Sequence, residues 1–239
     1  MLRLDRFLAE HSIGTRSEVK KYIANGCVKV NGTVVKKADM HIMEDTDCVE
    51  FNGSQILHSK FYYLMLNKPQ DTITASKDRC TTVFDLIHED YKDSLHAIGR
   101  LDKDTTGLLI LTNDGDLTHR MLSPKKHVDK TYEVTAESAI TEDMKKSLEQ
   151  GVLLDDKMTM PAIVAYTEDP FVCHLTIQEG RFHQVKRMFL AVGNEVTMLK
   201  RISMGPINLD PSLKEGDYRP LSETEIKMLY EITGLKERN

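Results

Sequence analysis

Apolar positions near the amino terminus recur at the spacing of helices. Residues 2–8 (LRLDRFL) place their leucines and phenylalanine on one face, as a helix packed on a core requires. Thr15 and Glu18 then have the spacing of a capping box, and apolar residues at helical spacing follow in 19–23 (VKKYI). The turn dipeptide at 25–26 ends this pattern. The segment predicts two short helices.

Alternating valines predict a hairpin directly after the second helix. Val28 and Val30 precede the dipeptide Asn31-Gly32, and two more valines follow at 34–35. An Asn-Gly pair favours a type I′ turn, because both central residues of that turn have positive φ. We therefore expect a small basic sheet beside the two helices.

Farther along the chain, short apolar runs predict strands and amphipathic segments predict helices. A capping box at Ser222 and Glu225 marks the start of the last helix. No regular βαβ repeat is visible, so we expect an α+β fold around a mostly antiparallel sheet. The expected strands lie at 61–66, 108–112, 131–135, 172–177 and 196–199, and the expected helices at about 115–122, 141–150, 182–192 and 223–232.

A polar stretch at 52–60 (NGSQILHSK) separates the two regions and reads as a linker. We place the boundary near residue 58. The chain then divides into a small domain at 1–58 and a larger domain at 59–239.

Composition narrows the class of protein. Hydrophobic residues make up 40% of the 239 residues, and no apolar run approaches the roughly 18 residues of a membrane span. The first residues do not resemble a signal peptide, so we expect a cytoplasmic location. Four scattered cysteines form no C-x-x-C pair, which argues against a zinc site or a disulfide framework and favours reduced, mostly buried thiols (Cys27, Cys48, Cys80, Cys173).

The distribution of charge matters more than its sum. The net charge is −5, yet residues 1–37 carry eight basic and only three acidic side chains. Such a block can be a solvated face or a surface that contacts phosphates. Motifs decide between them: R-L-D-x-x-L-A at 3–9 and T-R-S-E-V-K-x-x-I-x-x-G-x-V-x-V-N-G at 15–32 resemble the S4 RNA-binding domain over roughly residues 2–55.

The polar segment 96–107 (HAIGRLDKDTTG) leads directly into an apolar strand, as loops that carry sites often do. Taken alone, Asp102 in this segment is better explained as a turn or capping residue than as a catalyst. The wider pattern resembles the RsuA branch of the RsuA/RluA-type pseudouridine synthases. Its motifs are G-R-L-D-x-D-T-T-G-L-L-x-L-T-N-D-G at 99–115, H-R-x-x-S-P-x-x-x-x-x-K-T-Y at 119–132 and E-G-R-F-H-Q-V-K-R-M-F at 179–189.

The resemblance implies three catalytic residues. Asp102 corresponds to the essential aspartate of the family, Lys186 to its basic partner, and Tyr132 to the tyrosine that stacks on the target base. Without the resemblance, Lys186 would be a surface residue of an amphipathic helix, and Tyr132 a core residue of a strand. The reaction breaks and remakes a bond between ribose and uracil, and we find no motif for a metal or a nucleotide cofactor.

Several further residues are candidates for RNA contact. Arg100 could fill the place of an extruded nucleotide or hold a phosphate, and a structural ion pair is the alternative. Asp104 does not suggest a second catalyst, because its segment resembles a hydrogen-bonded turn. His119, His127 and His183 lack the spacing of a metal site. The expected RNA-binding set is Arg3, Arg6, Arg16, Lys20, Lys21, Arg100, Lys130, Arg181, His183, Gln184 and Arg187.

The details of the motifs resemble the small-subunit enzyme most closely. They imply 16S ribosomal RNA, free or in an assembly particle, as the substrate, with uridine 516 as the target. Action as a monomer is the simpler expectation. Three alternatives remain open: a large-subunit enzyme of the same family, a non-catalytic S4-type RNA-binding protein of ribosome assembly, and a nucleoside or nucleotide hydrolase, which would release free uracil.

Overall fold

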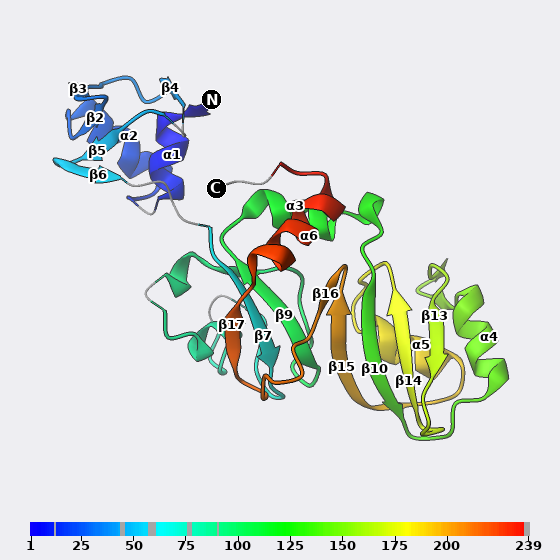
Figure 1. Ribbon diagram of the computed structural model, residues 1–239. Coiled ribbons are helices and arrows are strands. Elements are labelled where there is room, and N and C mark those ends of the chain that lie inside the picture. Colours follow the sequence, from blue (N-terminus) through cyan, green and yellow to red (C-terminus); the bar gives the residue numbers. More distant parts are fainter. Residues whose placement is uncertain (12, 44–45, 57–60, 76–77, 90, 237–239) are drawn as a thin grey trace. The chain divides into compact units, whose positions relative to one another are not determined.

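The computed structural model describes all residues except 12, 44–45, 57–60, 76–77, 90 and 237–239. The chain forms two compact units, Met1–Lys60 and Phe61–Asn239 (Figure 1). The boundary expected near residue 58 lies outside the described residues. None of the described helices is both long enough and apolar enough to cross a membrane.

The first unit contains the two predicted helices, α1 (Leu4–Glu10) and α2 (Arg16–Ala24). The capping box at Thr15 and Glu18 is confirmed, with the Glu18 backbone N–H donating to Thr15 Oγ1. The predicted hairpin is confirmed as well, since Asn31 and Gly32 both have positive φ between its two strands. The strands of this unit are β1 (Leu2–Arg3), β2 (Val28–Val30), β3 (Thr33–Val34), β4 (His41–Ile42), β5 (Val49–Phe51) and β6 (Ser54–Ile56).

The second unit is built on a sheet with the strand order β13-β14-β10-β15-β9-β7-β17 (Figure 1). Two short strands extend it, β8 beside β9 and β16 beside β15. All pairs are antiparallel except β9 with β15, so the expectation of a mostly antiparallel sheet is confirmed. Its strands are β7 (Tyr63–Lys68), β8 (His96–Ala97), β9 (Thr106–Thr112), β10 (Lys130–Ala136), β13 (Ile163–Tyr166), β14 (Val172–Ile177), β15 (Val196–Met204), β16 (Ile207–Asn208) and β17 (Tyr218–Pro220).

Two hydrophobic clusters lie on opposite sides of strands β7 and β9. Leu64 and Leu66 contribute to one cluster, whereas Tyr63 and Met65 contribute to the other. Because successive side chains of a strand point to opposite faces and both faces are covered here, the central residues of these strands are apolar at consecutive positions. The pattern explains why the runs at 61–66 and 108–112 are continuous in the sequence.

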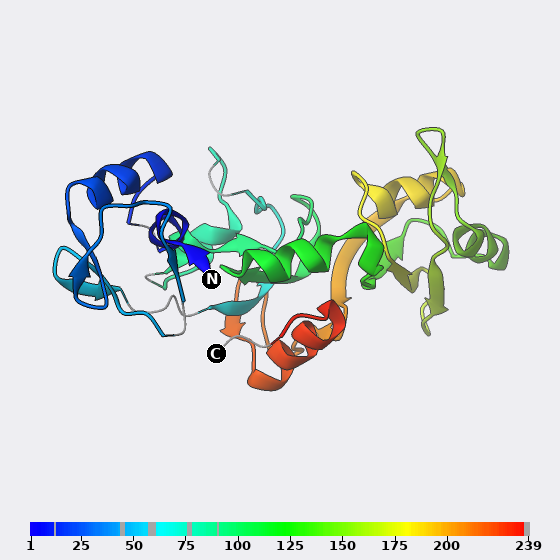
Figure 2. The ribbon, with the colours of Figure 1, turned by 90° about the horizontal axis from the view of Figure 1, so that it is seen from above.

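Helices cover both faces of the sheet. Helix α5 (Gln184–Ala191) contributes to the first cluster, and α3 (Gly115–Leu122) and α6 (Glu223–Thr233) to the second; in Figure 2, α5 lies on the opposite side from α6. Helix α4 (Glu142–Gln150) packs beside β13. The remaining elements are short: β11 (Leu153–Leu154), β12 (Lys157–Met158), and the 3-10 helices η1 (Val83–Leu86), η2 (Lys92–Ser94) and η3 (Pro124–Lys126).

The four cysteines are free, but the expectation that most are buried is wrong. Only Cys173, on β14, is buried, and Cys80 is exposed. Cys173 is the one cysteine within a strand of the large sheet, where neighbouring elements cover it. Burial raises the pKa of its thiol to about 11, so this side chain is un-ionised at neutral pH.

Candidate active site

The loop between β8 and β9 carries Asp102, and the buried side chain of Lys68 donates hydrogen bonds to the backbone of this loop. The Nζ of Lys68 donates hydrogen bonds to the backbone carbonyls of Pro69 at 3.1 Å, Lys103 at 3.2 Å and Thr105 at 2.8 Å. Lys68 has no exposed surface. One side chain at the end of β7 therefore fixes the backbone on both sides of Asp104.

Burial lowers the pKa of Lys68 to about 8, against the opposing influence of the carboxylates of Asp104 and Asp102. A lysine in water keeps its proton up to a pH of about 10.4. The lowered pKa means that burial destabilises the charged form of Lys68 by more than the nearby carboxylates stabilise it.

Hydrogen bonds fix one end of the loop, and a close approach of two strands fixes the other. Thr74 Oγ1 donates to the carbonyl of Leu101 at 3.0 Å and accepts from the Leu101 backbone N–H at 3.3 Å. At the other end, Gly107 has a φ of +96°, and a Cβ at this position would lie 2.3 Å from the carbonyl oxygen of Arg201. Only glycine permits this approach between β9 and β15.

The carboxylate of Asp102 faces two basic side chains at the start of α5. Lys186 Nζ lies 3.7 Å from Asp102 Oδ2, and His183 Nε2 lies 3.7 Å from Asp102 Oδ1. Lys186 is closer to Asp104, with a hydrogen bond of 2.5 Å to Oδ1, and this bond lowers the pKa of Asp104. The expected proximity of Lys186 to Asp102 is present, but two carboxylates share the lysine.

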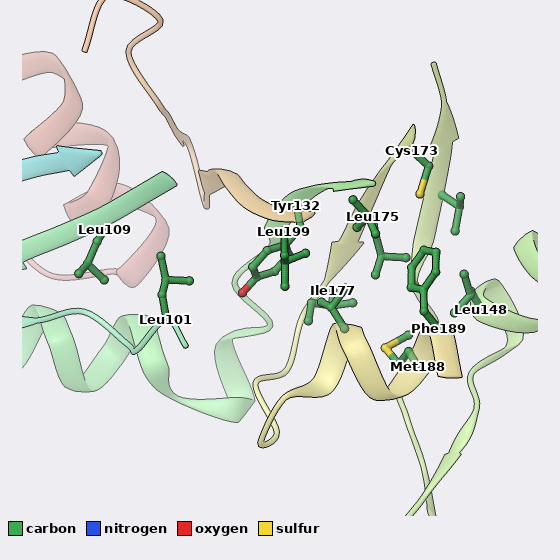
Figure 3. Close-up of a cluster of buried hydrophobic side chains, with 14 of the residues drawn as sticks. Leu101, Leu109, Tyr132, Leu148, Cys173, Leu175, Ile177, Met188, Phe189 and Leu199 are labelled. Atoms are coloured by element: carbon green, nitrogen blue, oxygen red, sulfur yellow. The ribbon is translucent and has the colours of Figure 1, made fainter. Parts of the chain in front are cut away.

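Tyr132 lies in the same pocket as Asp102. The pocket has a volume of about 720 Å³, and its lining includes Asp102, Tyr132, His183 and Arg100. Only 8% of Tyr132 is exposed, and its ring packs near Leu199 with the hydroxyl directed toward the side of Leu101 (Figure 3). A carboxylate and an aromatic ring that line one pocket, with a lysine beside the carboxylate, can bind a planar base and transfer a proton.

The other expected RNA-binding residues of this unit have different surroundings. Arg100 is exposed at the pocket. Arg181 donates to Glu179 and to the carbonyls of Lys157 and Met158, and Arg187 forms an ion pair with Asp155. Their part in RNA binding stays a prediction.

Gln184 is 4% exposed and is engaged at both ends of its amide. Its Nε2 donates to Glu179 Oε1 at 2.7 Å, and its Oε1 accepts from the Arg181 backbone N–H at 2.8 Å. Glu179, which sequence reasoning missed, therefore orders the segment that leads into α5. The predicted contact of Gln184 with RNA also stays a prediction.

The basic residues of the first unit are solvent-facing. Arg6, Arg16, Lys20 and Lys21 are exposed on α1 and α2. Arg3 is also exposed but forms an ion pair of 2.8 Å with Asp5.

Comparison with known proteins decides the family. Residues 62–191 match the family model described as RNA pseudouridylate synthase, and residues 2–45 match the S4 domain. The chain belongs to the RsuA-type pseudouridine synthases. As a member of this family, it is an RNA pseudouridine synthase, an isomerase.

Relatives of this pseudouridine synthase match it along nearly its whole length. It is 46% identical to the RNA pseudouridine synthase YtzG of Bacillus subtilis (strain 168), covering 96% of this chain and 99% of the relative. It is 41% identical to ribosomal small subunit pseudouridine synthase A of Escherichia coli (strain K12), covering 94% and 98%. A crystal structure of a pseudouridylate synthase matches with a TM-score of 0.70 and 42% identity, covering 96% of this chain and all of the other.

Three side chains of the pseudouridine synthase site were missed from the sequence. Lys68 and Arg201 are charged residues inside strands, and Glu179 lies in a loop. A signal existed for the first two, since each is a cation beside or within an apolar run and must therefore have a specific partner. Among the residues that the structure describes, no group of three or more His, Cys, Asp or Glu side chains could hold a metal ion.

Proposed function

We propose that this enzyme converts one uridine of small-subunit ribosomal RNA to pseudouridine, with Asp102 as the catalytic carboxylate. The observation that carries the proposal is the position of Asp102, at a pocket of nucleotide size beside Tyr132 and within 3.7 Å of both Lys186 and His183. The similarity to small-subunit enzymes supports the target, which by analogy is uridine 516.

The reaction needs a group that can act at the sugar or the base. The bond from ribose C1′ to N1 breaks, uracil turns, and a bond from C1′ to C5 forms; N1 gains a proton and C5 loses one. Asp102 serves as nucleophile or as base in this sequence. Tyr132 stacks on the extruded uracil and assists proton transfer at C5. Lys186, 3.7 Å from Asp102, places a positive charge beside the catalytic carboxylate.

Recognition of the RNA is divided between the two units. The exposed cations of α1 and α2 contact phosphates, together with Arg3, whereas Arg100, Lys130, Arg181, His183, Gln184 and Arg187 contact RNA around the pocket. The target uridine leaves a loop of the RNA to enter the pocket. The proposal includes action as a monomer in the cytoplasm, on free RNA or on an assembly particle.

The test is reverse-transcriptase mapping of carbodiimide-treated small-subunit RNA after incubation with enzyme. The wild type should create a new stop at one uridine, and Asp102→Asn should lower the rate by about 10²- to 10⁴-fold. Asp156→Asn is the matched control, because Asp156 is exposed with a φ of +58°, a conformation that Asn also tolerates.

Each alternative has its own outcome. Stops only in large-subunit RNA would overturn the target. Release of free uracil would indicate a hydrolase, and binding of RNA without any stop would indicate a non-catalytic protein. Equal rates for Asp102→Asn and Asp156→Asn would remove Asp102 from the mechanism.

A further inference from the structure

Arg201 on β15 is a buried charge with no counter-ion among the residues that the structure describes. Only 1% of the residue is exposed, and its Nε donates to the carbonyl of Leu108 at 2.8 Å. Its Nη2 is buried and has no hydrogen-bond partner among the described residues, none of whose carboxylates lies within 4.0 Å of the guanidinium. A buried, unpaired cation is costly, so such a residue normally meets a negative charge.

An irregularity in the sheet directs Arg201 to the pocket. Thr131 pairs with Ser203, but the next residue, Tyr132, pairs with Arg201, so β15 has one extra residue at this point. A bulge of this kind re-aims the following side chains. Arg201 thereby becomes the cross-strand neighbour of Tyr132 and lines the pocket with it.

A second cation lies at the same end of the pocket. Lys130, two residues before Tyr132, lines the pocket and donates from Nζ to the carbonyl of Val128 at 2.8 Å. Burial and the positive charge of Arg201 lower the pKa of Lys130. Asp129 opposes this shift only weakly, and its carboxylate accepts a hydrogen bond from Gln178.

Of the other charged groups at or beside the pocket, Arg181 pairs with Glu179, whereas Arg100 is exposed to solvent and needs no buried partner. Lys186 and His183 face Asp102 and Asp104. Lys130 and Arg201 therefore form a separate positive site that has no anion of the protein within salt-bridge distance among the described residues. The anion that neutralises them has to enter with the substrate.

We propose that Lys130 and Arg201 form a subsite for a backbone phosphate of the nucleotide whose base stacks on Tyr132. The inference rests on the proposed function, in which a uridine enters this pocket. A phosphodiester is the one group of RNA that is always negatively charged, and arginine and lysine are its usual partners. The subsite fixes the nucleotide at its phosphate while Asp102 acts at the sugar or base.

The test compares binding of uridine with binding of uridine 5′-monophosphate and uridine 3′-monophosphate by isothermal titration calorimetry. The wild type should bind at least one monophosphate about tenfold more tightly than uridine, the gain expected of a charge-assisted hydrogen bond. Lys130→Met should remove this preference. Lys125→Met is the charge-matched control and should keep it, because Lys125 is exposed and outside the pocket lining.

Arg201→Gln should also lose the preference, but this change removes the hydrogen bond to Leu108, so its folding must be checked by circular dichroism. Lys130→Met keeps the test decisive if Arg201→Gln does not fold. Equal affinity of the wild type for uridine and both monophosphates would overturn the proposal, as would an undiminished preference in Lys130→Met. Because the assay needs no conversion, a wrong RNA target would leave this result unchanged.

Discussion

Asp102 and Asp104 lie two positions apart in one loop, yet Lys186 holds them unequally. Its Nζ is 2.5 Å from Asp104 and 3.7 Å from Asp102. The shorter bond leaves Asp102 with the weaker of the two contacts. The proposed role of Asp102 fits this weaker contact, because a tightly paired carboxylate oxygen is a poor nucleophile and a poor base.

Replacing Lys186 by Met should raise the pKa of Asp104 toward its ordinary value. The wild-type pKa is lowered, so the pair contributes stability above the unfolded pKa of about 4 and loses it as the pH falls. In the variant, this pair should no longer contribute a decrease in unfolding free energy as the pH falls. Carbon NMR of the Asp104 carboxyl measures the titration, and Lys186→Arg should retain the low pKa. An unchanged titration in Lys186→Met would contradict the assigned cause.

Replacing Lys68 by Met should destabilise the protein by about 1–3 kcal/mol and reduce activity, because three backbone carbonyls, of which that of Thr105 is buried, lose their donor. The folded pKa is about 8, below that of the unfolded chain. Between about pH 8 and 10.4 the unfolded state binds more protons, so the contribution of Lys68 to stability rises with pH.

Urea unfolding of wild type and Lys68→Met at about pH 7 and about pH 9.5 checks this prediction. The difference between the two unfolding free energies should be larger at the higher pH. A difference that shrinks with rising pH would show that Lys68 is not held below its ordinary pKa.

At the scale of elements, the parallel pair β9 and β15 depends on Gly107. Gly107→Ala would place a Cβ 2.3 Å from the Arg201 carbonyl at a φ of +96°. We expect a loss of more than about 2 kcal/mol in unfolding free energy, because both the strain and the clash act on backbone. Thermal unfolding followed by circular dichroism measures the loss.

Gly115→Ala serves as the control for this substitution. Gly115 begins α3 and has no positive φ, and a Cβ at this position would meet no described atom within 4 Å. Its change should alter the unfolding free energy by less than about 1 kcal/mol, since alanine favours helices. Equal losses in both variants would show that the approach of β9 to β15 is not what requires glycine.

Longer elements were predictable from the sequence because each has a complete local pattern. The strand expected at 172–177 coincides with β14, and the capping box at Ser222 and Glu225 begins α6. Strand β15 was predicted only to Leu199, although it continues to Met204. The second half of the strand was not predicted because Lys200 and Arg201 interrupt the apolar pattern by which a strand is recognised in the sequence.

Short strands could not be predicted in the same way. Elements such as β4, β11 and β16 have two residues each and owe their conformation to a partner strand. The candidate site shows the same limit. Motifs pointed to Asp102, Tyr132 and Lys186, but the pairing that brings Arg201 beside Tyr132 depends on a bulge without a local signal.

At the scale of the whole molecule, the two units have separate cores. Among the described residues, the core cluster of the first unit draws on residues up to Ile56, and the clusters of the second draw on residues from Phe61 onward. A hydrophobic core of its own is what allows a domain to fold alone. The larger unit should therefore keep its structure without the smaller one.

A fragment of residues 61–239 should keep the near-ultraviolet circular dichroism of the intact protein almost unchanged, because it contains all the tyrosines except Tyr22. It should bind RNA more weakly and with a shallower salt dependence, by roughly 0.7–0.9 in logarithmic slope for each lost phosphate contact. Filter binding at several salt concentrations measures the slope. An identical slope for fragment and full chain would remove the first unit from phosphate contact.

The single parallel pairing in the large sheet also bears on how the protein folds. It joins β9 to β15 through two residue pairs, whereas β7 pairs with β9 at six positions and β10 with β15 at seven. Each half of the sheet can form from its own strands, but joining them must close a chain segment of nearly a hundred residues. Because Asp102 precedes β9 and Tyr132 lies on β10, the pocket exists only after this closure. We therefore expect the pocket to form late in refolding, after the local pairings within the sheet.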